Sequence, residues 1–110
     1  MTEHVRADPH LEEIRRVDPV SYEPAAALLK ALVAPMRLAL VDLLSEAPHC
    51  VHELVGALDV PQPLVSQHLK VLKSAGLVAT TRRGREVVYR LADDHVAHVV
   101  RDAVAHAREV

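Results

Sequence analysis

The sequence predicts a mainly α-helical fold with one small β-hairpin, and three observations lead to this prediction. Half of the 110 residues are apolar but none is Phe or Trp, so the core must be built from Leu, Val and Ala, a composition that favours helices. Apolar residues recur at helical spacing in segments that prolines separate. Two strand-like runs flank a glycine, as in a hairpin. The length indicates one domain, which we place at residues 9–110 after a polar, flexible arm at residues 1–8.

The N-terminal half is predicted to form three helices with prolines at their boundaries. Asp18 and Pro19 end the first helix, Pro24 can occupy the first turn of the second, and Pro35 separates the second from the third. We expect these helices at residues 9–17, 25–33 and 36–45.

The rest of the chain has the pattern of a helix-turn-helix followed by a hairpin and a helix. The predicted elements are helices at 51–58 and 63–74, strands at 77–81 and 86–91, and a last helix from Asp93 or Asp94 to about residue 109. This order predicts a winged helix-turn-helix with dimerisation helices at both ends. Because a chain this small buries a limited core, we expect a homodimer.

The net charge of −2 says little about partners, but the charges are unevenly distributed. Residues 1–61 have ten acids and five bases, residues 62–90 have six bases and one acid, and residues 91–110 have four acids and two bases. Clustered Lys and Arg side chains are typical of surfaces that contact DNA phosphates. We therefore expect phosphate contacts in the middle segment.

The second helix of the helix-turn-helix has an apolar side that can dock on the domain and a polar side that suits the major groove. Gln can bond an adenine edge, Ser and His can bond bases or phosphates, and Lys pairs with phosphate, while arginines at a hairpin tip suit a wing along the DNA backbone. The predicted DNA contacts are Gln62, Pro63, Ser66, Gln67, His68, Lys70, Arg82, Arg83 and Arg85. Taken singly, each element also fits an ordinary amphipathic helix pair or a solvated turn, but their order favours DNA binding.

Three stretches of the chain resemble the ArsR/SmtB family of metal-sensing repressors. They are residues 32–38 (LVAPMRL), 63–78 (PLVSQHLKVLKSAGLV) and 83–91 (RGREVVYRL). Through residues 50–55 (CVHELV) and 60–66 (VPQPLVS), the chain looks closest to the actinobacterial zinc-responsive SmtB type. The resemblance covers roughly residues 25–109 and implies a repressor, not an enzyme, that binds double-stranded operator DNA as a homodimer.

The last predicted helix carries Asp93, His95, His106 and Glu109. At about 100° per residue the two histidines share a face, but they are about 16 Å apart along the axis, whereas a zinc–nitrogen bond is about 2 Å. One straight helix cannot bring both to one ion, but two copies packed antiparallel can. The resemblance implies such a site for Zn²⁺, with two ligands from each protomer. Co²⁺ would be tolerated, and Ni²⁺, which usually prefers more ligands, is a further possibility. Without the resemblance, a capping Asp93 and solvated histidines remain the simpler interpretation.

A second metal site is compatible with the resemblance. Cys50, His52 and Glu53 lie at the start of the helix-turn-helix, and the N-terminal arm offers His4 and His10. The two-cysteine pattern of arsenic and cadmium sensors is missing, which argues against an arsenic site. A buried, inert Cys50 and partial zinc binding remain equal alternatives.

The sequence thus predicts a metal-responsive repressor whose apo dimer binds operator DNA and whose zinc-bound form releases it. A repressor that responds to nickel, to cobalt or to the redox state of Cys50 is the alternative. An enzyme is disfavoured, because we find no nucleophile motif or glycine-rich phosphate loop and the proposed ligands saturate zinc. No apolar run has the length of a membrane span and no signal peptide is visible, so we expect a cytoplasmic protein without a membrane partner.

Overall fold

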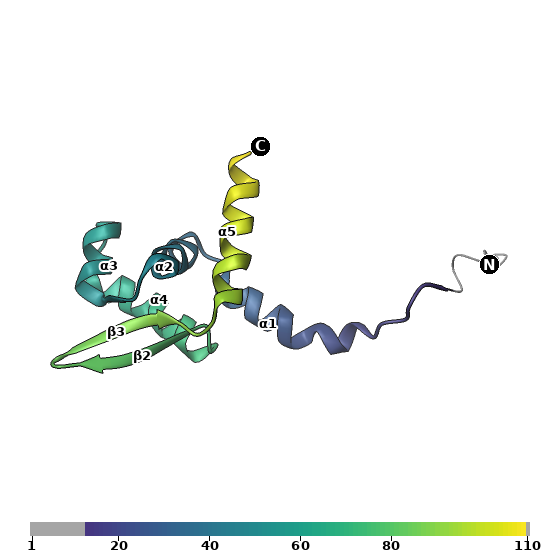
Figure 1. Ribbon diagram of the computed structural model, residues 1–110, viewed down its shortest axis with the longest axis horizontal. Coiled ribbons are helices and arrows are strands. Elements are labelled where there is room, and N and C mark those ends of the chain that lie inside the picture. The colour runs from purple at the N-terminus through teal and green to yellow at the C-terminus, as the bar shows by residue number, and fades with distance from the viewer. Residues whose placement is uncertain (1–12, 110) are drawn as a thin grey trace.

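The computed structural model describes residues 13–109. Over these residues the chain forms five α-helices, a 3-10 helix and a three-stranded antiparallel sheet (Figure 1). The elements are η2 (Pro19–Tyr22), α1 (Glu23–Leu32), α2 (Pro35–Glu46), β1 (His49–Cys50), α3 (Val51–Leu58), α4 (Gln62–Ser74), β2 (Val78–Arg83), β3 (Glu86–Leu91) and α5 (Asp94–Arg108). This order confirms the predicted winged helix-turn-helix with helices added at both ends.

The start of the described chain differs from the prediction. Residues 14–17, predicted to be helical, form no helix, and the arm at residues 1–8 lies outside the described residues. Ile14 and Val17 are 61% and 52% exposed, so the apolar side of this stretch does not pack against the part of the chain that the structure describes. The side chain of Asp18 instead caps η2, where it accepts a hydrogen bond from the backbone N–H of Val20 (3.0 Å).

A core of Leu and Val holds the domain together, as the composition predicts. Leu40 and Val41 of α2 are fully buried in this core, and α2 contacts α4, α5 and β3. Helix α4 contributes Val65, Leu69 and Leu72, all fully buried. Leu64, also expected on the apolar side of α4, is 37% exposed, because it lies at the edge of that side.

The sheet has the order β1-β3-β2, with β3 in the centre. Strand β1 was not predicted, because two residues are too few for a periodic signal. It pairs with β3 through His49 opposite Tyr89 and Cys50 opposite Val88. This pairing joins the start of α3 to the wing formed by β2 and β3.

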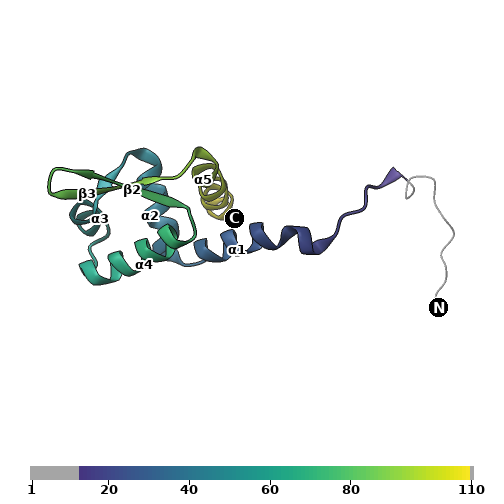
Figure 2. The same cartoon turned by 90° about the horizontal axis from the view of Figure 1, so that it is seen from below.

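Helix α1 extends away from the body of the domain, on the side remote from the wing, and its C-terminal end lies near α5 (Figures 1 and 2). Between α1, α2 and α5 lies an apolar groove of about 340 Å³. Its lining residues are Leu29, Leu32, Val33, Ala34, Pro35, Leu38, Val99, Val100 and Ala103. Within residues 13–109, no helix combines the length and the apolar character that crossing a membrane requires.

Candidate nucleic-acid interface and metal ligands

The helix-turn-helix consists of α3 and α4 joined by a tight turn. Asp59 ends α3 in the left-handed conformation (φ 55°), and its backbone N–H donates to the carbonyl of Val55 (2.8 Å). Pro61 then precedes α4, whose first turn contains Pro63, a position where the missing N–H of proline costs nothing. The turn thus reverses the chain within three residues and fixes the angle at which α4 meets the core.

The outer side of α4 carries most of the predicted DNA contacts. Because Val65, Leu69 and Leu72 anchor one side in the core, the opposite side faces solvent. The exposed predicted contacts on this helix are Gln62, Pro63, Ser66, Gln67 and Lys70. The structure therefore leaves these side chains free to meet a DNA groove.

His68 differs from the other predicted contacts, because it is half-buried and bonded to Arg37 of α2. Arg37 donates through Nη1 to Nδ1 of His68 (3.2 Å) and through Nε to the carbonyl of Ala31 (2.6 Å). A guanidinium has only donors, so Nδ1 accepts and the proton of the neutral imidazole is on Nε2. Arg37, which the sequence analysis did not single out, thus links the end of α1 to α4.

The wing presents the predicted arginines on its exposed outer end. Arg83 pairs with Glu86, so the strands are joined by the two residues Gly84 and Arg85. Gly84 has a φ of +63°, as the first central residue of a type II′ hairpin turn requires. Arg82 and Arg83 belong to β2 rather than to the tip where we expected them, but all three predicted wing arginines are exposed.

The four ligands predicted on the last helix lie at its two ends. Asp93 is the N-cap of α5: its Oδ1 accepts hydrogen bonds from the backbone N–H groups of His95 (2.8 Å) and Val96 (3.3 Å). The imidazole of His95 is 94% exposed and its Nδ1 lies 3.5 Å from Oδ1 of Asp93. His106 lies in the last turn, and Glu109 is the C-cap. Among residues 13–109 of a single chain, these four side chains do not come together.

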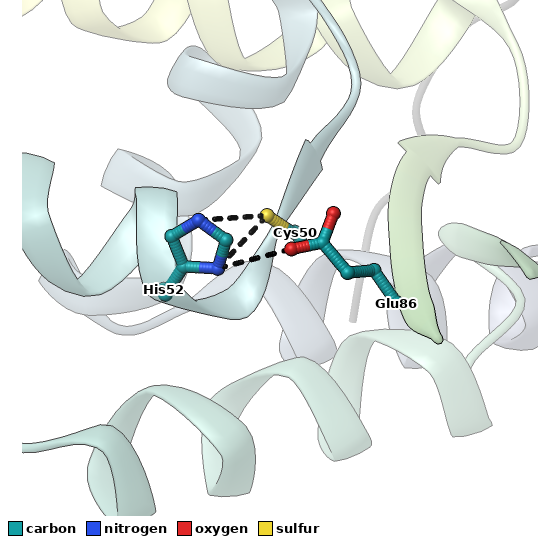
Figure 3. Close-up of side chains that lie close together, drawn as sticks. All are labelled: Cys50, His52 and Glu86. Atoms are coloured by element: carbon teal, nitrogen blue, oxygen red, sulfur yellow. Dashed lines mark hydrogen bonds and ion pairs between the residues drawn. The ribbon is translucent and has the colours of Figure 1, made fainter. Parts of the chain in front are cut away.

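A different group of ligand-type side chains does come together. The side-chain ligand atoms of Cys50, His52 and Glu86 all lie within 4.8 Å of one another. Figure 3 shows the thiol of Cys50 and the carboxylate of Glu86 on the same side of the imidazole of His52. Sγ of Cys50 lies 3.2 Å from Nδ1 and 3.5 Å from Nε2 of this ring, and Oε2 of Glu86 lies 3.6 Å from Nδ1. Glu86, at the start of β3, was not predicted, because the β1–β3 pairing that brings it to Cys50 gives no signal in the sequence.

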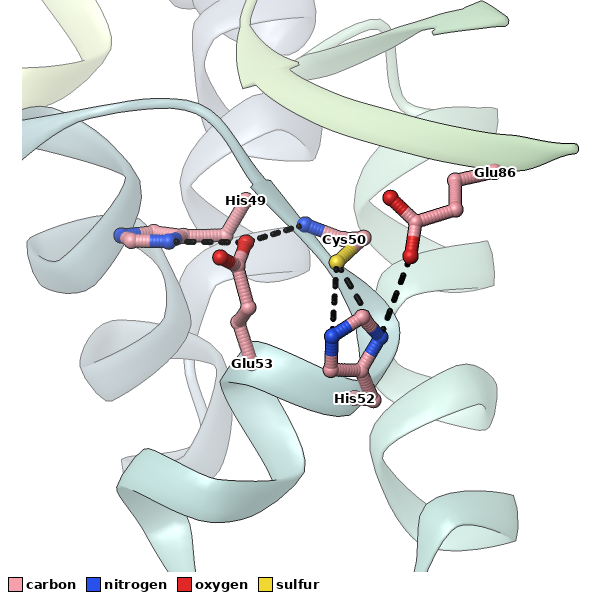
Figure 4. Close-up of polar contacts among 5 residues, drawn as sticks. All are labelled: His49, Cys50, His52, Glu53 and Glu86. Atoms are coloured by element: carbon pink, nitrogen blue, oxygen red, sulfur yellow. Dashed lines mark hydrogen bonds and ion pairs between the residues drawn. The ribbon is translucent and has the colours of Figure 1, made fainter. Parts of the chain in front are cut away.

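Glu53, predicted as a ligand together with Cys50, is turned to the other side of β1 (Figure 4). Its Oε1 accepts a hydrogen bond from the backbone N–H of Cys50 (3.0 Å) and lies 3.3 Å from Nδ1 of His49. The backbone N–H of Cys50 first, then its thiol and then His49 lower the pKa of Glu53. His4 and His10, the predicted partners from the arm, lie outside the described residues.

The thiol of Cys50 is buried at the edge of the core and reduced, with no disulfide partner in the chain. Burial, followed by the neighbouring carboxylate of Glu53, raises the pKa of the thiol above its ordinary value. The thiol is therefore protonated at neutral pH unless a cation displaces the proton.

Comparisons with known proteins give the family. The model of the arsR family of bacterial regulatory proteins matches residues 34–80. The transcriptional repressor SmtB of Mycobacterium tuberculosis is 66% identical over 87 residues, which are 79% of this chain and 64% of that protein. A transcriptional repressor SmtB homolog of Synechocystis is 39% identical over 105 residues, covering 91% of this chain and 80% of that protein. The chain thus spans less than two thirds of the length of the M. tuberculosis relative, 64%.

The solved structures agree with the fold. The homodimeric winged helix-turn-helix DNA-binding domain of Mb0332 from Mycobacterium bovis superimposes with a TM-score of 0.73 at 31% identity, over 83% of this chain and 84% of that one. The relatives are transcription regulators rather than enzymes, which agrees with the predicted lack of catalysis. The chain belongs to the ArsR family of bacterial regulatory proteins, with SmtB repressors among its relatives.

Proposed function

We propose that the chain is a zinc-responsive transcriptional repressor, which binds operator DNA as an apo homodimer and releases it when zinc binds between the two α5 helices. The observation that carries this proposal is the exposed outer side of α4, with Ser66, Gln67 and Lys70, next to a wing with three exposed arginines. The names of the relatives, which are repressors, support it. Such a protein works where the DNA is, in the cytoplasm, without a membrane partner.

The DNA contacts divide into two kinds. On α4, the amide of Gln67 and the hydroxyl of Ser66 can bond base edges in the major groove, and Lys70 pairs with phosphate. The wing arginines pair with phosphates of the adjoining backbone and carry no sequence information. His68, held by Arg37, keeps its Nε2–H as a donor. This assignment gives His68 a positioning role through α2 in addition to any contact with DNA.

The apolar groove between α1, α2 and α5 supports dimerisation by a second copy of the chain. Leu29, Val33 and Val99 at the groove are 47%, 74% and 43% exposed. A monomeric domain rarely leaves such a cluster of apolar side chains in contact with water. A second α1 and α5 packed across this face would cover them, and the Mb0332 domain is described as homodimeric. A two-fold dimer presents two α4 helices and two wings to a two-fold DNA site.

The residues at the ends of α5 are chemically suited to zinc. Two imidazoles and two carboxylates form a tetrahedral set. Oδ1 of Asp93 makes the capping hydrogen bonds, and Oδ2 of the same carboxylate can serve as the ligand. The exposed imidazole of His95 can turn toward a partner helix. In an antiparallel pair, Asp93 and His95 of one protomer face His106 and Glu109 of the other, which gives two identical sites per dimer.

The release of DNA follows from linkage between the two sites. Bound zinc supplies a crosslink between the two α5 helices. Because α5 packs on α2, and α2 packs on α4, the relative position of the two α5 helices determines the spacing of the two α4 helices. If the crosslinked spacing fits DNA less well, zinc weakens DNA binding, and DNA must weaken zinc binding by the same factor.

The test is a gel shift of the protein on DNA from the promoter of its own gene, with and without zinc. His106→Ala is expected to bind DNA like the wild type without metal and to lose the zinc response. The matched control is His98→Ala, which removes an exposed histidine of the same helix that is not among the ligands, and which should respond to zinc normally. Loss of DNA binding by metal-free His106→Ala would contradict this division of roles.

The alternative is a repressor that answers to nickel, cobalt or the redox state of Cys50. The same gel shift with each metal and with an oxidant separates these signals. Release by oxidant that Cys50→Ser abolishes, with no response to zinc, would favour the redox alternative.

A further inference from the structure

We propose that Arg37 is a positioning residue for DNA binding. Arg37 lies in the first turn of α2, and its side chain bonds both to the C-terminal end of α1 and to α4. Contact between two copies of the chain at α1 would then set the placement of the helix that reads DNA. The inference rests on the proposed function, because it takes α4 as the reading helix and the groove beside α1 as the dimer interface.

The guanidinium of Arg37 has a separate acceptor for each of its three nitrogens. Nε donates to the carbonyl of Ala31 in α1 (2.6 Å), and Nη2 donates to the carbonyl of Val33, the C-cap of α1 (3.4 Å). Nη1 donates to Nδ1 of His68 in α4 (3.2 Å). Because a guanidinium is planar and holds its donors at fixed angles, these bonds fix the acceptors relative to one another. The single ammonium group of a lysine cannot do so.

The end of α1 explains why a cation is placed there. The last carbonyls of a helix have no partner within the helix, and the helix dipole gives this end a partial negative charge. Arg37 supplies both hydrogen bonds and a positive charge to the carbonyls of Ala31 and Val33. Among residues 13–109, no carboxylate lies within ion-pair distance of Arg37. Its charge therefore serves the end of α1 and the imidazole of His68 rather than a neighbouring acid.

On α4, the bond to Arg37 lies at the boundary between the buried and the outer side. His68 is half-buried and stands between Gln67, which is exposed, and Leu69, which is fully buried. Packing of apolar side chains such as Leu69 is not directional, whereas a hydrogen bond is. The bond to Arg37 therefore restricts the rotation of α4 about its axis, and with it the direction in which Gln67 points.

On the other side, the bonds of Arg37 reach the wall of the apolar groove. Leu32 and Val33 line this groove, and Ala31 precedes them. Leu32 is buried in the same core as Leu69, so apolar packing also joins α1 to α4. Arg37 adds the directional contact. A second chain seated in the groove would fix the end of α1, and through Arg37 the end of α1 would fix α4.

The first experiment measures DNA binding by the metal-free full chain, with fluorescence anisotropy on DNA from the promoter of its own gene. Protein concentrations are chosen at which sedimentation shows each variant to be a dimer. Arg37→Met keeps the length of the side chain but removes every donor, and should bind DNA about tenfold more weakly or worse. Arg37→Lys keeps the charge and should still bind about fivefold more weakly or worse, because one ammonium cannot reach all three acceptors.

Two further variants separate positioning from direct contact with DNA. If Arg37 acts through His68, the double variant Arg37→Met/His68→Leu should lose less affinity than the product of the two single losses. Lys70→Met, which removes a proposed phosphate contact, should flatten the salt dependence of binding by about one unit of the log–log slope. Arg37→Met should keep the wild-type slope. Circular dichroism verifies that each variant is folded.

Three results would overturn the proposal. The first is wild-type DNA affinity in a folded, dimeric Arg37→Met or Arg37→Lys. The second is a loss of salt dependence in Arg37→Met like that of Lys70→Met, which would mean that Arg37 contacts a phosphate itself. The third is multiplication of the separate losses of Arg37→Met and His68→Leu in the double variant.

Hydrogen exchange of the free chain separates failure of this proposal from failure of the proposed function. The backbone N–H groups of Val33 and Ala34 donate to the carbonyls of Lys30 and Leu32 at the end of α1. In Arg37→Met these two amides should exchange about fivefold faster or more, because the end of α1 loses its cap. Unchanged exchange would contradict the role of Arg37, whereas a wild type that does not bind the DNA would contradict the proposed function. A missing zinc response affects neither measurement.

Discussion

The two groups of candidate metal ligands differ in how many chains complete them. Cys50, His52 and Glu86 are brought together within one chain by the pairing of β1 with β3. Asp93 and His106 lie at opposite ends of the 15-residue helix α5 and need a second chain to meet on one ion.

This difference has a functional consequence. The first group comes together without dimerisation, because its three side chains belong to the same domain. Metal binding to the second group would be linked to the position of one chain relative to the other, and such a linkage can transmit a signal to the paired DNA-reading helices. An interchain site is thus suited to sensing, whereas an intrachain site is suited to holding the wing on α3.

The largest expected effect comes from breaking the proposed dimer. Leu29→Glu places a carboxylate at the apolar groove, where it is solvated in the free chain but buried and unpaired in the dimer. An unpaired buried charge costs about 3–5 kcal/mol, so dimerisation should weaken about a hundredfold or more. Sedimentation equilibrium measures this change.

The same variant tests whether ion binding by the ligands at the ends of α5 requires the dimer. Leu29→Glu should lose the ion at α5 and bind DNA more weakly. Val71→Glu is the control for dimerisation, because Val71 is an exposed apolar residue of α4 outside the groove. An unchanged dimerisation constant in Leu29→Glu would show that this groove is not the interface.

A smaller effect is expected from Glu53, which we assign to the start of α3 rather than to a metal. The pKa of its carboxyl is lowered, chiefly by the backbone N–H of Cys50, from an ordinary value of 4.5. A lowered pKa in the folded state means that the carboxylate stabilises the fold above the unfolded-state pKa, and that this contribution is lost as the pH falls through the folded-state value.

Glu53→Gln should therefore melt at a modestly lower temperature than the wild type at pH 7, and the difference should shrink as the pH is lowered below the ordinary carboxyl pKa of 4.5. Thermal unfolding followed by circular dichroism at several pH values measures it. Glu46→Gln, at the exposed end of α2, is the matched control. A difference that stays constant over this pH range would argue against the charge of Glu53 as the cause.

The sequence predicted the elements well where the signal is local. The prolines at positions 24 and 35, the periodic Leu and Val of α4 and the glycine of the hairpin each depend on a few adjacent residues, and the corresponding elements are present. The helix expected to end at Pro19 is not formed at residues 14–17. What could not be predicted depends on tertiary pairing. The two-residue strand β1 exists because β3 lies beside it, and with it come the approach of Glu86 to Cys50 and the orientation of Glu53 toward His49.

Long-range side-chain bonds were missed for the same reason. Arg37 and His68 are 31 residues apart, and no periodic pattern connects them. His68 was thus grouped with the solvent-facing residues of α4, although it lies at the boundary with α2. The four ligands of α5 were assigned from the resemblance to the family, and their convergence stays a prediction because it requires a second chain.

The smallest expected effect on stability separates the two roles of Asp93. Its Oδ1 caps α5, and the proposed zinc site uses the same carboxylate. Asn caps helices about as well as Asp, so Asp93→Asn should change the free energy of unfolding by less than about 0.5 kcal/mol, whereas Asp93→Ala should cost about 1 kcal/mol. Both variants should bind zinc at α5 about tenfold more weakly or worse, since neither offers a carboxylate. Urea unfolding and zinc titration of the dimer measure the two properties separately, and wild-type zinc affinity in Asp93→Asn would leave Asp93 with the capping role alone.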